Sequence, residues 1–320
     1  MSIESTPHLS NIKVSHGFHA HWQTILPFIR RDLRAILKPI HGEFKTFVSF
    51  DGYPIAYRRW EHKNISCSNK TLFILSHGLE GSAESGYIQE TAADLHAKTY
   101  DVWAWYMRGC SAIDSGPLLY NSGFTADLRT LTEEAKKLGY KHIHLIGFSV
   151  GGNITLKLLG EGITGISKAI CFSVPLQLGD VAQHLSKSFY GFYMKRFLKS
   201  LKEKIIISKQ RYPEAVYNMD MLDRCHDFES FDENFTAPMH GYTSAFDYYT
   251  HCSSLYFLKN IETSCLIVNA QNDPFLPLSC FPDPLLFPKI KFEYPKEGGH
   301  CGFEQKGKSM VTWTLDFITQ

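Results

Sequence analysis

The sequence predicts an α/β fold in which a mainly parallel sheet has helices on both faces and a helical cap inserted above it. Three observations lead to this prediction. Short apolar segments alternate with helical segments along most of the chain, which is typical of a buried parallel sheet. An Asp-Gly turn joins two β-rich segments near the start, and residues 176–249 are helical, aromatic and charged without an obvious buried strand.

The individual elements follow from local composition. Residues 43–50 and 53–60 flank Asp51-Gly52, so we expect an antiparallel hairpin that opens the sheet. Continuous apolar character predicts later strands at 71–76, 101–106, 143–148, 168–173, 265–270 and 291–294. Helices are expected near 84–98, 125–138, 152–159 and 309–318.

The chain of 320 residues is long enough for one large core with an insertion. We expect an N-terminal extension at 1–42, a first part of the core at 43–175, a cap or lid at 176–249 and a second part of the core at 250–320. No coiled-coil heptad or long exposed apolar strand predicts a homo-oligomer, so the oligomeric state stays open.

The composition excludes several classes of function. The formal net charge of +1 gives no global field for holding nucleic acid. The eight cysteines lack paired CxxC spacing, which indicates reduced thiols in a cytoplasmic protein rather than a disulfide framework or a zinc site. No segment reaches the roughly 18 apolar residues that span a bilayer. The sequence contains no HExxH, strand-linked GxGxxG or Walker lysine, so no metal or cofactor is expected.

The strongest chemical motif is Gly147-Phe148-Ser149-Val150-Gly151, which lies between an apolar strand and a helical segment. A Gly-x-Ser-x-Gly elbow holds its serine in strained backbone angles, and the small flanking residues let strand and helix approach each other. The hydroxyl is then lifted above the sheet, near the helix N-terminus. We therefore predict Ser149 as a catalytic nucleophile; the alternative is a plain tight turn.

A second motif, Ser76-His77-Gly78-Leu79-Glu80-Gly81-Ser82, directly follows the strand at 71–76. Acyl transfer creates a negatively charged oxygen, which two backbone N–H groups can stabilise in an oxyanion hole. The predicted donors are Leu79 in this loop and Val150 beside the serine. His77 precedes the serine in the chain and is expected to shape the loop; the alternative is a glycine-rich loop without a catalytic role.

The other members of a Ser-Asp-His triad are expected after the last strands, because enzymes with this elbow have that chain order. Asp273 follows a predicted strand, and His300 lies in a glycine-flanked loop after the last one. We predict His300 as the general base and Asp273 as the acid that orients it. Asp247 and Asp316 are weaker candidates for the acid. An Asx-type turn at Asp273 and a surface histidine at His300 are the alternatives.

Motifs spread along the chain form one set: His77-Gly78-Leu79-Glu80-Gly81-Ser82, Arg108-Gly109-Cys110-Ser111, Gly147-Phe148-Ser149-Val150-Gly151-Gly152-Asn153, His240-Gly241-Tyr242, Asp247-Tyr248-Tyr249, Asn272-Asp273-Pro274-Phe275 and Gly298-Gly299-His300-Cys301-Gly302-Phe303. Together with His21-Trp22-Gln23-Thr24-Ile25-Leu26-Pro27, they resemble the YheT-like α/β hydrolases over residues 17–317. The resemblance implies the α/β-hydrolase fold and a cytoplasmic, bacterial-type hydrolase. It also implies similarity to the eukaryotic α/β-hydrolase-domain lipases that act on acylglycerols and phospholipids, with carboxylesterase activity on short model esters.

Two positions depart from the pattern of that family. Asn272 stands where the family usually has a second aspartate, and Cys301 follows the histidine where an aliphatic residue is common. Neither belongs to the predicted triad, so the departures concern local tuning rather than the reaction. Two rival functions remain: a thioesterase or amidase with the same triad, and a catalytically idle α/β-hydrolase fold that serves as a binding protein.

Three further features have both a structural and a functional interpretation. Arg108 either anchors loops, which is favoured, or binds a substrate carboxylate. Residues 187–211 hold eight Lys or Arg residues and one acid among aromatic side chains. They suit weak contact with an anionic membrane surface, although a solvated helix with its aromatic face on the core is favoured. The insertion is expected to cover Ser149 and line an apolar pocket, which predicts a small-molecule ester or lipid substrate.

Overall fold

The computed structural model describes residues 12–37, 40–63, 66, 70–215, 217–303, 310–311 and 314–319. Within them, one sheet has eight strands in the order β1-β2-β4-β3-β5-β6-β7-β8. The strands are β1 (Glu43–Val48), β2 (Pro54–Trp60), β3 (Thr71–Ser76), β4 (Asp101–Trp105), β5 (His142–Phe148), β6 (Lys168–Phe172), β7 (Ser264–Val268) and β8 (Ile290–Glu293). β2 pairs antiparallel with both β1 and β4, and the other pairs are parallel.

The strand predictions are confirmed, each within two residues of its expected ends. The hairpin of β1 and β2 turns at Gly52, whose φ of 86° favours glycine. Strands β3 to β7 are buried along almost their whole length because helices cover both faces of the sheet. This burial is the physical reason for their continuous apolar composition.

The register brings the carboxyl ends of the central strands to one edge. Ser76 at the end of β3 pairs with Gly147 of β5, and Phe172 at the end of β6 pairs with both Phe148 and Val268. The loops that follow β3, β5, β6 and β7 therefore leave the sheet side by side. The loops after β3, β5 and β7 carry the Ser76–Ser82 motif, the Ser149 elbow and Asp273, and the loop after β6 leads into residues 176–249.

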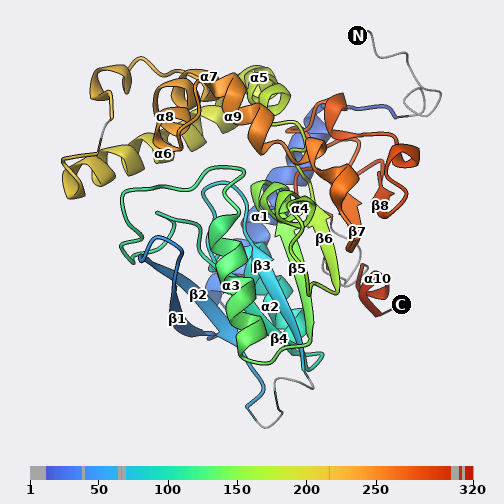
Figure 1. Cartoon of the computed structure of the whole chain (residues 1–320). Coiled ribbons are helices and arrows are strands. Elements are labelled where there is room, and N and C mark those ends of the chain that lie inside the picture. Colours follow the sequence, from blue (N-terminus) through green and yellow to red (C-terminus); the bar gives the residue numbers. More distant parts are fainter. Residues whose placement is uncertain are drawn as a thin grey trace.

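Helices cover both faces of the sheet. α3 (Ala126–Lys137) and α4 (Val150–Gly160) contribute to one hydrophobic core, and α2 (Gly86–His96) and α10 (Leu315–Thr319) contribute to the other. Figure 1 shows α3 and α4 in front of the sheet and α2 behind it. The helices predicted at 84–98, 125–138 and 152–159 are confirmed. The helix predicted at 309–318 is confirmed only at its end, because α10 begins at Leu315 and residues 310–311 form a turn. Residues 309 and 312–313 lie outside the described residues.

Five helices between β6 and β7, which we call the cap, stand above the carboxyl edge of the sheet (Figure 1). They are α5 (Leu178–Lys187), α6 (Phe192–Arg211), α7 (Phe228–Phe231), α8 (Ala237–Met239) and α9 (Ala245–Cys252). A π-helical turn, η5 (Asp232–Thr236), joins α7 to α8. Four short 3₁₀ helices also lie between β6 and β7: η3 (Ser188–Gly191), η4 (Met219–Met221), η6 (Ser254–Tyr256) and η7 (Leu258–Asn260). Two more, η8 (Leu278–Cys280) and η9 (Pro284–Leu286), lie between β7 and β8. The described residues of 176–249 contain no strand.

α1 (Phe18–Leu37) is absent from the predicted elements and lies in the segment expected to be an N-terminal extension. It packs tightly on α2, because a Cβ on Gly86 would lie 2.3 Å from the Arg31 carbonyl carbon. The Gly86 N–H also donates to Asp32 Oδ1 at 2.8 Å. α1 is therefore part of the packed body. Among the described helices, none is long and apolar enough to cross a membrane.

Candidate active site

Ser149 lies at the turn between β5 and α4, above the carboxyl edge of the sheet. Its φ of 53° and ψ of −120° are strained for a residue with a side chain. A Cβ on Gly147 would lie 2.5 Å from Gly152 Cα, and a Cβ on Gly151 would lie 2.3 Å from the Ser76 carbonyl oxygen. Only glycine fits at both flanks, which is the physical reason for the Gly-x-Ser-x-Gly spacing.

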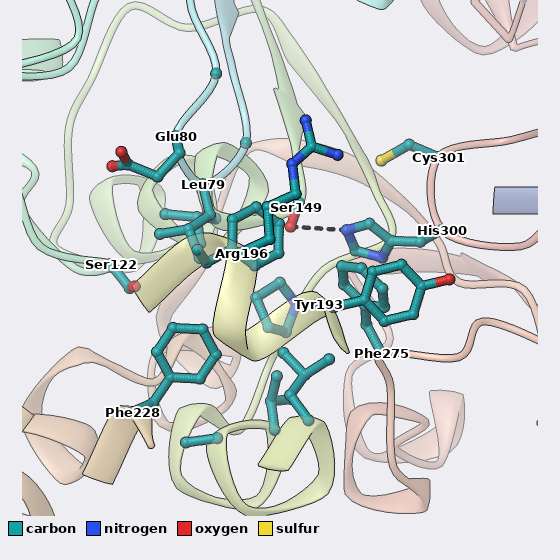
Figure 2. Close-up of a pocket in the computed structure, with 18 of the residues that line it drawn as sticks. Leu79, Glu80, Ser122, Ser149, Tyr193, Arg196, Phe228, Phe275, His300 and Cys301 are labelled. Carbon is teal, nitrogen blue, oxygen red and sulfur yellow. Dashed lines mark hydrogen bonds between the residues drawn. The ribbon is translucent and has the colours of Figure 1, made fainter. Parts of the chain in front are cut away.

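Ser149, His300 and Asp273 form a chain of hydrogen bonds, and Figure 2 shows its first link, between Ser149 and His300. His300 Nε2 lies 3.0 Å from Ser149 Oγ, and His300 Nδ1 lies 2.9 Å from Asp273 Oδ2. The Asp273 side chain is fully buried and the His300 side chain is 12% exposed. A carboxylate only accepts hydrogen bonds, so Nδ1 of the neutral imidazole carries the proton. Nε2 then accepts the hydroxyl proton of Ser149.

Asp273 is the carboxylate that the structure brings to His300. Asp273 Oδ1 also accepts from the Phe275 N–H at 2.9 Å, and the Phe275 ring stacks on His300 with centroids 4.0 Å apart. Asp247 lies instead in the first turn of α9, and Asp316 lies in the first turn of α10. Both hydrogen bonds at His300 Nδ1 go to Asp273.

The loop after β3 lies against Ser149. A Cβ on Gly78 would lie 3.2 Å from Ser149 Cβ, and the Gly78 N–H donates to Tyr87 Oη at 2.8 Å. Leu79 and Val150 line the same cavity as Ser149. In the described part of the chain, neither of their N–H groups has a hydrogen-bond acceptor. Both predicted donors are therefore available to an oxygen at this place.

His77 is completely buried, and its hydrogen bonds connect the loop after β3 to the loop after β4. Its Nε2 accepts from the Met107 N–H at 3.0 Å, so the proton lies on Nδ1, which donates to the Gly78 carbonyl at 2.7 Å. Burial lowers the pKa of His77 to about 4, which keeps the ring neutral. These contacts agree with the expectation that His77 shapes the loop.

Glu80 belongs to the Ser76–Ser82 motif, but the sequence predicted no role for it; its side chain connects this loop to the cap. Its carboxylate accepts from Tyr120 Oη at 2.8 Å, from Lys204 Nζ at 2.7 Å and from Ser200. Lys204 and Ser200 both belong to α6, at least 120 residues away in the sequence. The carboxylate therefore fixes the position of the neighbouring Leu79 relative to the cap.

α1 holds the loop that carries His300. Thr24 Oγ1 accepts from the His300 N–H at 3.0 Å. The buried Arg31 donates to the Cys301 carbonyl at 2.5 Å and to the Gly302 carbonyl at 2.6 Å. These partners are 270 to 276 residues apart in the sequence. The segment expected to be an extension thus supplies contacts that position the loop of His300, a role that the sequence did not predict.

Asn272 joins three segments of the site. Its Nδ2 donates to Gln23 Oε1 of α1 at 2.6 Å, and its Oδ1 accepts from the Gly299 N–H at 3.0 Å. An asparagine can donate and accept at once, whereas an aspartate only accepts. The departure from the family pattern therefore suits a position between an amide oxygen and a backbone N–H.

The cysteines near the site are protonated thiols. Burial raises the pKa of Cys301 to about 12 and that of Cys110 to about 11. The thiolate is the nucleophilic form of cysteine, so neither side chain competes with Ser149 at neutral pH. The seven cysteines in the described residues form no disulfide.

Arg108 has the structural role that the sequence favoured. Its side chain is fully buried and pairs with Asp127 at 2.8 Å and with Asp51 at 2.6 Å. Its guanidinium also lies 5.2 Å from the centre of the Phe124 ring. Arg108 thereby connects α3 to the hairpin turn and the loop after β4.

A cavity of about 690 Å³ opens from Ser149 under the cap. Figure 2 shows Leu79, Tyr193, Phe228 and Phe275 among the residues around it. The expected apolar pocket beneath the insertion is confirmed, with one difference: α1 also lines it. The α1 side chains in the wall are Thr24, Ile25, Phe28, Ile29 and Arg31.

Comparison with known proteins places this geometry in a family. Residues 71–307 match the family model described as the alpha/beta hydrolase fold. YheT of Escherichia coli (strain K12), named as a candidate esterase, is 30% identical over 76% of this chain and 74% of its own. The monoacylglycerol lipase of Saccharomyces cerevisiae is 29% identical over 65% of this chain, and the match spans about half (49%) of the yeast protein. Human phospholipase ABHD3 is 25% identical over 88% of this chain and 70% of its own.

Solved structures share the fold at lower identity. The Pyrococcus furiosus esterase Pf2001 superposes with a TM-score of 0.57 at 14% identity, covering 87% of this chain and 92% of that one. An esterase from Exiguobacterium antarcticum gives a TM-score of 0.54 at 16% identity, covering 88% of this chain and 100% of that one. By its family-model match, its identity to YheT and its sheet, the chain belongs to the α/β-hydrolase fold family, among the YheT-like members.

Proposed function

We propose that the chain is a serine hydrolase that cleaves carboxylic esters through Ser149, His300 and Asp273. The observation that carries this proposal is the hydrogen-bonded chain from Ser149 Oγ to His300 Nε2 and from Nδ1 to Asp273, at the inner end of an apolar cavity. A hydroxyl activated by an imidazole, with a buried carboxylate behind it, is the arrangement that acyl transfer needs.

In the first half of the reaction, Ser149 Oγ attacks the ester carbonyl carbon while His300 Nε2 takes the hydroxyl proton. Asp273 stabilises the imidazolium that forms. The carbonyl oxygen becomes negative and is stabilised by the N–H groups of Leu79 and Val150, each of which contributes roughly 3 kcal/mol to lowering the barrier. The C–O bond then breaks, and His300 returns its proton to the leaving alcohol.

In the second half, water attacks the acyl-enzyme on Ser149. His300 Nε2 takes a proton from this water, and the tetrahedral intermediate uses the same two N–H groups. Collapse of the intermediate returns the proton to Ser149 Oγ and releases the carboxylic acid. No cofactor takes part in either half of this scheme.

The similar proteins support an ester substrate. The names of relatives and of similar structures include a candidate esterase, a monoacylglycerol lipase, a phospholipase and esterases. The cavity is mostly apolar, with side chains such as Val181, Leu185 and Leu201 from the cap. An acyl chain therefore fits the wall better than a strongly polar group does.

A fluorophosphonate probe separates this proposal from the idle-fold alternative. An active serine hydrolase forms a covalent adduct at Ser149, which mass spectrometry locates, whereas a binding protein stays unmodified. Matched oxygen esters, thioesters and amides with the same acyl group then rank the three substrate classes. The proposal is rejected if Ser149 is not labelled, or if the oxygen ester is the poorest of the three substrates.

The first prediction concerns the acyl chain. For p-nitrophenyl esters, kcat/KM is expected to rise from acetyl toward octanoyl, by at most about fourfold per methylene, because each buried methylene contributes roughly 0.8 kcal/mol. The Val181→Phe variant narrows the cavity under α5 and should lose long-chain activity while keeping acetyl activity. A flat series from acetyl to octanoyl would contradict an acyl-binding role of the cavity.

The second prediction tests α1 as a positioning element. Thr24→Val is expected to lower kcat about tenfold, because the hydrogen bond to the His300 N–H is lost and the imidazole is held less firmly. KM for a short soluble ester should change less. Thr24→Ser keeps the hydroxyl and should retain most of the activity. Steady-state kinetics of both variants measure the difference, and equal losses in the two would argue against this role.

A further inference from the structure

α1 turns the polar residues Thr24 and Arg31 inward and six large apolar residues outward. The buried face, at spacings of three and four residues, consists of Ala20, Thr24, Pro27 and Arg31. The opposite face consists of Phe18, Trp22, Leu26, Ile29, Leu33 and Ile36, which are between 37% and 74% exposed. We call these six residues the apolar strip. A surface helix ordinarily has the reverse arrangement, with its apolar face on the core.

The inward contacts fix the rotation of α1 about its axis. Thr24 and Arg31 hold the loop of His300, and Asp32 accepts from the Gly86 N–H. If α1 were rotated so that the strip faced inward, these hydrogen bonds would break and no new polar contact would replace them. The strip is therefore held toward solvent by the same contacts that position His300.

The strip is continuous with the mouth of the cavity. Ile29 belongs to the strip and also lines the cavity, as does its neighbour Phe28, which is 37% exposed. On the other side, Phe192 of α6 lines the cavity and is 52% exposed. The Arg196 guanidinium lies 5.6 Å from the centre of the Phe28 ring, so α1 and α6 meet at this mouth. Figure 2 shows Arg196 among the residues around the cavity.

Positive charge lies on α6, which meets α1 at this mouth. α6 holds seven Lys or Arg residues and one acid, Glu203. Lys195 and Arg196 near its N-terminal end are exposed and have no ion-pair partner among the described residues. Arg34 of α1 is exposed as well, although it pairs with Glu90 at 3.1 Å. An apolar strip beside unpaired cations matches a surface that has an apolar interior and anionic groups at its boundary.

We propose that the apolar strip of α1 and the N-terminal half of α6 form a docking surface for anionic lipid bilayers. The strip enters the boundary between headgroups and acyl chains, and Lys195 and Arg196 contact lipid phosphates. The cavity then opens onto the layer that holds acyl chains. α6, within the predicted contact segment 187–211, supplies the charge, and α1 supplies the apolar anchor.

The positive charge of α6 argues against a second copy of the chain as the partner of this surface. In a two-fold dimer through this face, the cations of each copy would lie close to those of the other. Such a dimer would also cover the residues that form the cavity mouth. A bilayer instead brings opposite charge to Lys195 and Arg196 and leaves the mouth in contact with lipid.

The test measures binding without turnover, so it does not depend on the proposed ester hydrolysis. The Ser149→Ala protein is mixed with vesicles of phosphatidylcholine, with or without phosphatidylglycerol. Among the described tryptophans, Trp22 is half-exposed in the strip, whereas Trp60, Trp103 and Trp105 are buried; the fifth, Trp313, lies outside the described residues. We expect a blue shift of tryptophan emission on binding, which Trp22→Phe removes. The double variant Leu33→Glu/Ile36→Glu should lower the partition coefficient at least about tenfold.

A matched control carries the same charge change elsewhere. Leu285 and Leu286 on η9 are 83% and 57% exposed, and Leu285→Glu/Leu286→Glu should bind vesicles like the parent. Lys195→Gln should weaken binding only to vesicles with phosphatidylglycerol. Three outcomes overturn the proposal: the parent binds neither vesicle, both double variants bind like the parent, or the parent is a dimer that Leu33→Glu/Ile36→Glu converts to a monomer without vesicle binding.

Discussion

Replacing Ser149 with alanine is expected to lower kcat for ester hydrolysis at least about a thousandfold, because the variant has no hydroxyl to form the acyl-enzyme. The fold should be retained. The Ser149 N–H donates to the Phe172 carbonyl at 2.8 Å, and this backbone contact does not depend on the side chain. Alanine also has the same Cβ, so the strain at a φ of 53° is unchanged. Initial rates with p-nitrophenyl butyrate and the Tm measure the two effects.

Ser122 provides the matched control, because it is another serine in the wall of the same cavity. The hydrogen bonds of Ser122 are made by its backbone atoms. Its N–H donates to Tyr248 Oη at 3.0 Å, and its carbonyl accepts from Asn153 Nδ2 at 2.7 Å. Ser122→Ala should therefore keep most of the activity and the probe labelling. If Ser149→Ala kept unchanged kinetics, the nucleophile would have to be sought elsewhere.

The sheet and the three residues of the hydrogen-bonded chain could be predicted because their signals are local. A strand buried on both faces must be apolar throughout, and parallel strands bring their carboxyl ends to one edge. The elbow needs glycine at 147 and 151, since any side chain there would meet backbone within 2.6 Å. Asp273 and His300 then followed from their places after β7 and β8.

The contacts of α1 could not be predicted because they are not local. The His21–Pro27 segment contributes to the family resemblance but predicts no role for Thr24, Arg31 belongs to no motif, and their partners lie 270 or more residues away. The apolar spacing in α1 is also misleading, since a helical stripe of large apolar residues ordinarily predicts a face on the core. Here the structure turns that stripe to solvent, because the polar face makes the hydrogen bonds to the loop of His300.

The contacts of the cap with the site could not be predicted from the sequence either. Its helical character follows from the sequence, but its links to the site depend on single side chains that meet across the fold. Tyr193 Oη lies 3.0 Å from His21 Nδ1 of α1, and the Tyr193 ring packs on Phe275 with centroids 4.6 Å apart. Glu80 of the loop after β3 and Lys204 of α6 form an ion pair across the fold as well. Such contacts depend on tertiary geometry that residue type and spacing do not encode.

Replacing Asp273 with asparagine is expected to lower kcat by about a thousandfold to ten-thousandfold, with a smaller change in KM. The carboxylate accepts the Nδ1 proton of His300 through both oxygens, at 2.9 and 3.1 Å. An amide that turns its N–H toward Nδ1 favours the other tautomer, with the proton on Nε2. Nε2 then cannot accept the proton of Ser149 Oγ, and the imidazolium also loses its buried counter-charge.

Asp247→Asn is the matched control, because the same substitution is made at the rival carboxylate in the first turn of α9. It should leave kcat almost unchanged. In Asp273→Asn, the amide oxygen of the new side chain can still accept from the Phe275 N–H. That variant should therefore keep a Tm near that of the parent while fluorophosphonate labelling slows in parallel with kcat. A lower Tm with proportional loss of folded protein would indicate a structural role for Asp273. If Asp247→Asn proved the more damaging of the two, the acid would be misassigned.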